Sequence, residues 1–409
     1  MEPPQPTNWH RNAKFGIIIH WGVYSVPAFD STEHAKKRKI MNGSEWYLRR
    51  LVATFRVGAS EKLTKEYHSK EYPHESYADL AKRFTAENWN PNDWANLIAR
   101  SGARYVLITA KHHDGFCLWK TNTNKDWNSL STGPKRDILG DFLSAIRSLD
   151  ARKLPQGIIR AGLYYSWHEW DRTSGVDLCN KEYVSTIVAR QIQELATYKP
   201  SIVFFDGDWL RGAGHWNSKK AIQTFTKANS ECVVNDRLGK NDSWQKLRRE
   251  DGNMLANYRT FADRTTPTKE QLIQDNQPNP EHKPKRQWAW ERVDTIGLSW
   301  GRNKQQTVKD YKSLEELIGL LIDVVCKGGC LLLNIGPNSD GTLDKIEVER
   351  LECIGRWLEK NGEAIYDTLP YTSSDTVDNT SYTTTKNGKV YKFVKDDVFG
   401  GWKFVLLDV

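Results

Sequence analysis

Short runs of consecutive apolar residues, each ending in polar side chains, recur along the 409-residue chain. They are Phe15–Ile19, Tyr105–Ile108, Ala161–Tyr165, Ile202–Phe205, Cys232–Val234 and Cys330–Leu333. Strands that are apolar throughout are typical of a parallel sheet covered by helices on both faces. The pattern therefore predicts buried parallel strands whose carboxyl ends carry polar groups.

Segments with helical spacing of apolar residues lie between these runs. Asn90-Pro91 forms a cap followed by proline, and Gly102 ends the apolar pattern that follows. Tyr183–Tyr198 and Leu314–Val325 also predict helices. Alternation of strands and helices over roughly 350 residues favours a (β/α)8-like TIM barrel or a doubly wound sheet. No glycine-rich phosphate loop follows the first run, which counts against a nucleotide-binding sheet.

The character of the sequence changes near Tyr366. Threonine-rich and alternating segments surround Asn387-Gly388, a pair that favours a tight hairpin. About three strands are too few for a full sandwich. We therefore expect the barrel at residues 1–365 and a short C-terminal β domain, a truncated β-sandwich, at residues 366–409.

The charge balance and the cysteines exclude several classes of function. The net charge of +8 comes from basic residues that mostly alternate with acids, apart from short clusters such as Lys36–Lys39, so a nucleic-acid partner is not expected. No apolar run reaches the ~20 residues of a membrane span. The six cysteines form no CxxC pair, so neither a disulfide framework nor a cysteine metal site is predicted.

The first residues do not resemble a signal peptide. This fits a cytosolic protein or a mature exported one, and of the two we expect a secreted, periplasmic or lysosomal-type mature form. The sequence does not specify the oligomeric state.

Polar residues at the ends of the predicted strands are the candidate functional residues. In a barrel these ends meet at one face, which is where active sites lie. Adjacent histidines on a strand point to opposite faces and there is no HExxH motif, so neither a metal nor a cofactor is expected. The strand-end residues are His20, His112, His113, Tyr165, Asp206 and Arg237.

A carboxylate at a strand end, several histidines and 17 tryptophans suit glycoside hydrolysis. That reaction needs two carboxyl groups, which lie about 5–5.5 Å apart in retaining enzymes. We predict that Asp206, at the end of Ile202–Phe205, is the nucleophile. Asp208, two residues later, is a weaker candidate.

Several segments, in order across nearly the whole chain, resemble the retaining α-L-fucosidases of glycoside hydrolase family 29. They are "FGIIIHWGVYSVPAF" (15–29), "EWY" (45–47), "RFTAENWNPNDWANLIARSGARYVLITAKHHDGFCLW" (83–119), "VFFDGDW" (203–209), "VVNDR" (233–237), "WERVDTIGLSWG" (290–301) and "LLLNIGPNSDG" (331–341).

The resemblance implies a barrel with a C-terminal β-sandwich that removes terminal α-L-fucose from fucosylated glycans with net retention. It places the nucleophile on the fourth strand, where Asp206 is expected. Trp300 would pack against the methyl face of the sugar. The residues implied to line the fucose pocket are His20, Glu45, Trp46, His112, His113, Tyr165, Arg237 and Trp300.

The second carboxyl group is harder to assign. The family often has a glutamate several tens of residues after the nucleophile, and here a gapless match gives Ala262, with Asp263 one position later. Asp263 is our predicted acid/base and Glu291 is the alternative, followed by Asp251 and Glu250.

Three other possibilities stay open. A non-catalytic fucose-binding barrel and an α-L-galactosidase are the alternative functions. Basic clusters at predicted strand-end insertions, such as Lys36–Lys39, also allow a sulfated fucan as the substrate.

Overall fold

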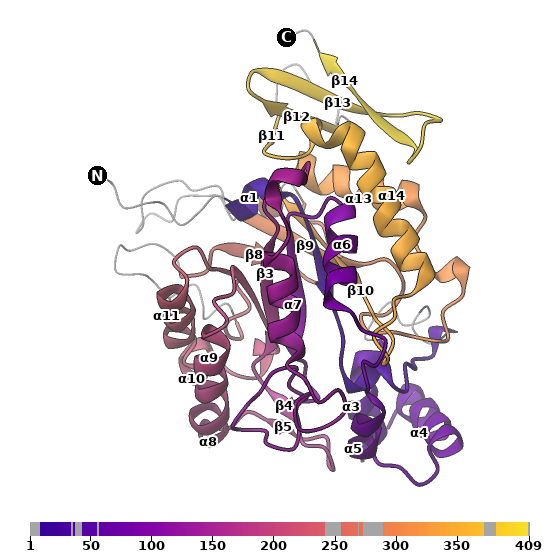
Figure 1. Ribbon diagram of the computed structural model, residues 1–409, viewed down its shortest axis with the longest axis vertical. Coiled ribbons are helices and arrows are strands. Elements are labelled where there is room, and N and C mark those ends of the chain that lie inside the picture. Colours follow the sequence, from indigo (N-terminus) through magenta and orange to yellow (C-terminus); the bar gives the residue numbers. More distant parts are fainter. Residues whose placement is uncertain are drawn as a thin grey trace.

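The computed structural model describes residues 9–33, 36, 43–54, 57–241, 255–268, 270–272, 289–371 and 382–407. Eight parallel strands form its centre (Figure 1). They are β1 (Phe15–Ile19), β2 (Tyr105–Lys111), β3 (Arg160–Ser166), β6 (Ile202–Asp206), β7 (Val233–Val234), β8 (Tyr258–Thr260), β9 (Ala289–Thr295) and β10 (Cys330–Ile335).

The order of the strands distinguishes a barrel from a doubly wound sheet. β1 pairs with both β2 and β10, so the first and last strands are neighbours and the others follow in chain order. β7 and β8 stand at the two ends of this order. The backbone N–H of Asn257 donates to Val234 O at 2.8 Å, and Oδ1 of Asn257 accepts from Val234 N at 2.9 Å. The predicted barrel is confirmed, and the side chain of Asn257 completes the seam between β7 and β8.

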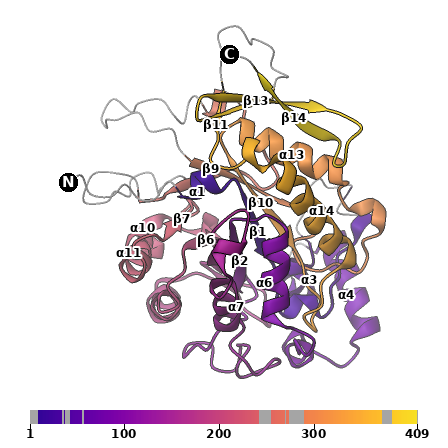
Figure 2. The ribbon, with the colours of Figure 1, turned by 45° about the horizontal axis from the view of Figure 1, so that its top comes forward.

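Helices surround the strands, as Figure 2 shows for α6, α7 and α14. The cap predicted at Asn90 is present, since its side chain accepts from Asn92 N. The predicted helix after residue 183 contains a π-helical turn, Val184–Val188, between two α-helical parts. The helices are α1 (Trp9–Ala13), α3 (Tyr47–Val52), α4 (Ala59–Glu71), α5 (Tyr77–Leu80), α6 (Pro91–Arg100), α7 (Ile138–Arg147), α8 (Lys181–Tyr183), α9 (Ala189–Ala196), α10 (Ala213–Trp216), α11 (Ser218–Ala228), α13 (Leu314–Cys326) and α14 (Lys345–Asn361). None in the described ranges is long and apolar enough to cross a membrane.

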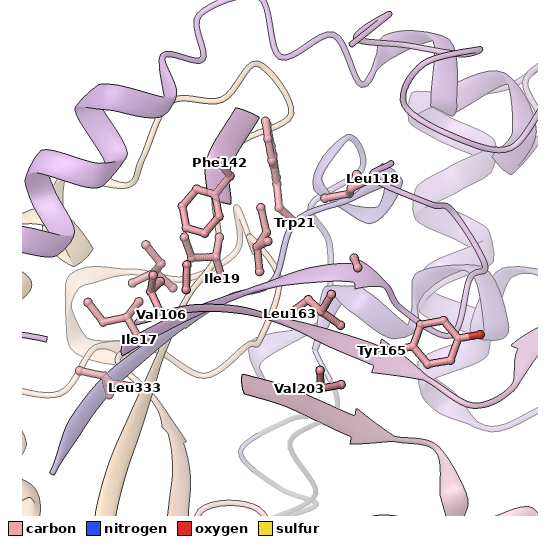
Figure 3. Packing of buried hydrophobic residues seen from close by; sticks show 14 of the residues in the cluster. Ile17, Ile19, Trp21, Val106, Leu118, Phe142, Leu163, Tyr165, Val203 and Leu333 are labelled. Atoms are coloured by element: carbon pink, nitrogen blue, oxygen red, sulfur yellow. The ribbon is translucent and has the colours of Figure 1, made fainter. Parts of the chain in front are cut away.

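Successive strand residues alternate between the barrel interior and the layer beneath the helices. The interior cluster contains Ile18, Leu107, Tyr164 and Phe204. The outer cluster, part of which is drawn in Figure 3, contains Ile17, Val106, Leu163, Tyr165 and Val203. This alternation decides which strand-end side chains can reach a site inside the barrel.

Four antiparallel strands form the C-terminal sheet: β11 (Leu369–Pro370), β12 (Tyr382–Lys386), β13 (Lys389–Lys395) and β14 (Trp402–Leu407). The predicted hairpin is present, with positive φ at both Asn387 and Gly388 as a type I′ turn requires. Nε1 of Trp357 in α14 donates to Trp402 O at 2.7 Å, which ties this sheet to the barrel's helices. The domain boundary at residue 365 stays a prediction.

A buried lysine at the end of β2 supports the carboxyl face of the barrel. Nζ of Lys111 donates to Glu169 at 2.9 Å, Tyr183 at 3.0 Å and Gln191 at 3.0 Å. Glu169 begins a hairpin formed by β4 (Glu169–Trp170) and β5 (Asp177–Leu178). Trp170 N donates to His113 O at 2.7 Å, so the lysine holds this hairpin against the strand end that carries the two histidines.

Lys111→Met should lower the free energy of unfolding by about 3–5 kcal/mol, because Glu169 would stay buried without its cation. Urea titration followed by tryptophan fluorescence measures the change. Lys82→Met is the matched control, since Lys82 pairs with Asp79 at the exposed surface, and it should shift nothing measurable. Equal unfolding midpoints for wild type and Lys111→Met would contradict this role.

Candidate active site

Asp206 is the last residue of β6, the fourth strand of the barrel, and its side chain reaches the barrel mouth. Oδ2 accepts from the Tyr164 hydroxyl at 2.7 Å, and Oδ1 accepts from Nη1 of Arg237 at 2.8 Å. Nε2 of His113 lies 3.8 Å from Oδ2. Only 9% of Asp206 is exposed. A cation and a hydroxyl thus hold this carboxylate in one orientation at the barrel mouth.

Arg237 connects Asp206 to a second carboxyl group. Its Nη2 forms an ion pair with Oδ1 of Asp263, and its Nε donates to Oγ1 of Thr260 at 3.2 Å. Burial lowers the pKa of Arg237, but the two carboxylates outweigh burial and raise the pKa well above its ordinary value. The Asp263 side chain is 45% exposed, so it lies at the rim. The site therefore has a buried carboxylate and an accessible one on the same guanidinium.

Three histidines line the pocket beside Asp206. Nδ1 of His20 bonds to Oδ1 of Asn334 at 2.6 Å, and Nδ1 of His113 bonds to the Ser166 hydroxyl at 2.6 Å. Burial lowers the pKa of His20 to about 4 and the pKa values of His112 and His113 well below the ordinary value. The three rings are therefore neutral near pH 7, each with one donor and one acceptor nitrogen.

Two tryptophans flank these histidines. The ring of Trp46 lies 5.9 Å from His113, and the ring of Trp300 lies 5.4 Å from His20. Glu45 accepts from Gly43 N at 2.6 Å and from Gly301 N at 3.2 Å, and burial raises its pKa. Oε1 of Glu45 thus fixes the segment that carries Trp46, and Oε2 ties that segment to the one that carries Trp300.

The expected position of Tyr165 in the pocket is wrong. Its hydroxyl donates to Gln191 at 2.7 Å in the outer layer, where it also receives a hydrogen bond from Lys111. Tyr164, one residue earlier, faces the interior and contacts Asp206. Adjacent strand residues point to opposite faces, so a one-residue error moves the side chain out of the site.

Glu291 cannot serve as the alternative acid/base, because it lies at the other end of the barrel. It is near the start of β9, paired in register with Cys330 at the start of β10. Its Oε2 bonds to Nε2 of His10 in α1 at 2.9 Å and accepts from the Tyr105 hydroxyl at 2.5 Å. Glu291 is fully buried there. In Figure 1, α1 lies at the upper end of the barrel and the β4–β5 hairpin lies at its lower end.

Asp208 is close to the pocket but is held by the neighbouring loop. Its Oδ2 accepts from Gly239 N at 2.9 Å, and burial raises its pKa to about 6. Asp251 and Glu250, the remaining candidates, lie outside the described residues. In the described ranges, no group of three or more His, Cys, Asp or Glu is arranged to hold a metal ion.

The sequence interpretation missed several residues of the site. Tyr164 could have been found from strand alternation together with the register that sets Ser166 beside Asp206. Trp170 contacts His113 with a ring distance of 5.2 Å, and the ring of His168 stacks on that of His113 at 4.6 Å. His168 lies in the loop after β3, and Trp170 lies in the two-residue strand β4, so both segments are too short to show an apolar periodicity.

The chain is similar to known proteins over most of its length. A family model described as alpha-L-fucosidase matches residues 3–363. The alpha-L-fucosidase of Dictyostelium discoideum is 34% identical over 399 residues, which cover 94% of this chain and 77% of the relative. The tissue alpha-L-fucosidase of Rattus norvegicus is 33% identical, with 94% and 75% covered. The crystal structure of Thermotoga maritima alpha-fucosidase in complex with fucose aligns with a TM-score of 0.72 at 33% identity, covering 94% of this chain and 82% of that one.

The lowered pKa of His20 predicts a pH-dependent stability. An unfolded histidine takes up a proton below about pH 6.5, whereas folded His20 stays neutral down to about pH 4. Its contribution is therefore present above pH 6.5 and is lost as pH falls toward 4. The stability difference between wild type and His20→Gln should fall by about 2 kcal/mol from pH 7 to pH 5. Urea titrations at both pH values test this, and a constant difference would refute it.

Proposed function

Because this chain belongs to the α-L-fucosidase family, we propose that Asp206 and Asp263 are the two catalytic carboxyl groups of its reaction. The chain is a retaining, exo-acting glycoside hydrolase that removes terminal α-L-fucose from fucosylated glycans. The observation that carries the assignment is the shared contact of both carboxylates with Arg237. One guanidinium keeps the two groups close, which supports the separation of about 5–5.5 Å that retention needs.

In the first step, a carboxylate oxygen of Asp206 attacks the anomeric carbon while protonated Asp263 gives its proton to the departing oxygen. The bond to the leaving group breaks, and a fucosyl ester of Asp206 forms. In the second step, Asp263, now a carboxylate, takes a proton from water as the water oxygen attacks the same carbon. Asp206 leaves as a carboxylate, Asp263 is protonated again, and fucose is released with its original configuration.

Arg237 suits these two reaction steps because the negative charge alternates between its two partners, Asp206 and Asp263. Before the first step Asp206 is charged and Asp263 is neutral, and in the ester intermediate the reverse holds. Arg237 contacts both positions, so a cation faces the negative charge at each stage. The exposed position of Asp263 lets it turn from the guanidinium toward the leaving oxygen and toward water.

The neutral histidines and the tryptophans suit the sugar itself. Nδ1 of His20 and Nδ1 of His113 are already bonded to Asn334 and Ser166, so each of these two rings has its Nε2 left for one sugar hydroxyl. Nδ1 of His112 is buried and has no hydrogen-bond partner among the described residues, so a sugar hydroxyl would satisfy it. Trp300 is 7% exposed and offers an apolar surface for the 6-methyl group. An α-L-galactosidase would need room for a hydroxyl at this position.

The sulfated-substrate option rests on sequence alone and stays a prediction. Lys36, from the basic cluster Lys36–Lys39, forms an ion pair with Asp310. One positive charge of that cluster is therefore already neutralised within the protein. The rest of that cluster, Lys37–Lys39, lies outside the described ranges. The same holds for two later groups of basic residues in the sequence that also suggested a sulfated substrate: Lys246, Arg248 and Arg249, and Lys283, Lys285 and Arg286.

Asp206→Gly should lower kcat for an aryl α-L-fucoside by a factor on the order of 10⁴ or more, since the ester cannot form. Added azide should restore turnover and give β-L-fucosyl azide, because it attacks from the face that Asp206 has left. Product analysis by NMR identifies the anomer. Asp208→Asn is the matched control and should stay within about tenfold of wild type. Unchanged turnover by Asp206→Gly would refute the nucleophile assignment, whereas no turnover by the wild type would leave a fucose-binding barrel.

Asp263→Ala should discriminate between leaving groups. With a fucosylated sugar, kcat/KM should fall by about 10²–10⁴. With 2,4-dinitrophenyl α-L-fucoside the first step should be nearly unaffected, since that leaving group needs no proton. The basic limb of the pH profile should also disappear. Glu291→Gln, at the opposite end of the barrel, should keep the wild-type profile. Equal losses on both substrates would reject Asp263 as the acid.

A further inference from the structure

Trp209 is the only exposed tryptophan in the part of the chain that the structure describes. It is 46% exposed, whereas Trp167 and Trp216 nearby are fully buried. It belongs to a short 3-10 helix, Asp208–Leu210, that begins two residues after Asp206. A single exposed apolar side chain is common on protein surfaces, so its surroundings must decide whether this ring has a role.

The ring of Trp209 lies directly outside the pocket wall. It makes edge-to-face contacts with His113 at 5.4 Å and with His168 at 5.3 Å. The two histidine rings are parallel and 4.6 Å apart. Because His113 also faces Asp206, it lies between the buried Asp206 and the exposed Trp209. The tryptophan therefore stands where the group attached to a bound fucose would leave the pocket.

The segment that carries Trp209 is fixed in place. Gly207 has a left-handed φ of 75°, which turns the chain sharply after β6. Nε1 of Trp216 donates to Asp208 O at 3.2 Å, and Gly239 N donates to the Asp208 carboxylate. A rigid aromatic surface loses little entropy when a ligand packs on it.

Polar groups beside Trp209 add hydrogen-bonding capacity. Asp177 in β5 lies 3.6 Å from Nε2 of His168, and its other oxygen lies 4.0 Å from Nη2 of Arg49. The side chains of Asp177 and Arg49 are 29% and 38% exposed, so both reach solvent at the rim. The pair has no net charge. An apolar ring face next to a carboxylate and a guanidinium matches the C–H face and the hydroxyls of a neutral sugar better than a sulfate.

We propose that Trp209, Asp177 and Arg49 form the subsite for the first sugar of the leaving group, a neutral pyranose that lies on the indole ring. The inference rests on the proposed function, since it needs a fucosyl bond that is cleaved at Asp206. It adds a specificity determinant outside the fucose pocket. The enzyme then favours fucosylated oligosaccharides over fucosides with small leaving groups.

The test compares two substrates that differ only beyond the scissile bond, α-L-fucosyl fluoride and a fucosylated lactose trisaccharide. Trp209→Ala should lower kcat/KM for the trisaccharide by about tenfold, as loss of one stacking contact does, while kcat/KM for the fluoride stays close to wild type. Trp209→Phe should restore most of the loss. Phe399→Ala is the matched control, because Phe399 is 48% exposed in the C-terminal region, and it should change neither substrate.

Two results would overturn the subsite alone. Equal losses on both substrates would mean that Trp209 acts by holding His113, and no loss on either would mean that no sugar lies on it. A wild-type protein that hydrolyses neither substrate would instead reject the proposed function, and the subsite with it. The fluoride reaction therefore separates failure of the subsite from failure of the active-site assignment.

Discussion

The contact of one guanidinium with two carboxylates is the interaction on which the site depends. Asp206 is nine-tenths buried, and a buried carboxylate without a cation is costly. Arg237 supplies that cation and is itself held by Thr260. The neighbouring carboxylate, Asp236, accepts from the N–H and the hydroxyl of Thr260 at 2.8 Å each. The seam between β7 and β8 thus both completes the barrel and positions the arginine.

This explains why side chains, rather than a regular ladder, join the last pair of strands. β7 and β8 are the shortest strands of the barrel, with two and three residues. Asn257 and Asp236 take over the hydrogen bonds that longer strands would form with backbone groups alone. A barrel strand that ends early leaves room at its carboxyl end, and Arg237 occupies that region with its guanidinium over the ring of Phe204.

The sequence predicted most of the fold and much of the site, because apolar runs and the polar residues that end them are local signals. Asp206, Arg237, His20 and both adjacent histidines come together as expected. The prediction for Tyr165 was wrong because strand alternation alone does not say which of two adjacent residues faces the barrel interior. Only the register of β3 with β6 selects Tyr164. The alternative assignment of Glu291 as acid/base was wrong because the partner that reveals its place, His10, is 281 residues away in the sequence. No local pattern shows that an N-terminal helix covers the amino end of the barrel.

Position along the barrel determines different chemistry for similar residues. Glu291 and Asp206 are both buried carboxylates with a tyrosine donor. At the amino end Glu291 pairs with His10 beneath α1, where no substrate can reach it. At the carboxyl end Asp206 shares Arg237 with an exposed acid, so its negative charge can be transferred and restored. In the proposed mechanism, catalysis therefore depends less on the carboxylate itself than on a cation that serves two carboxylates, one of them open to water.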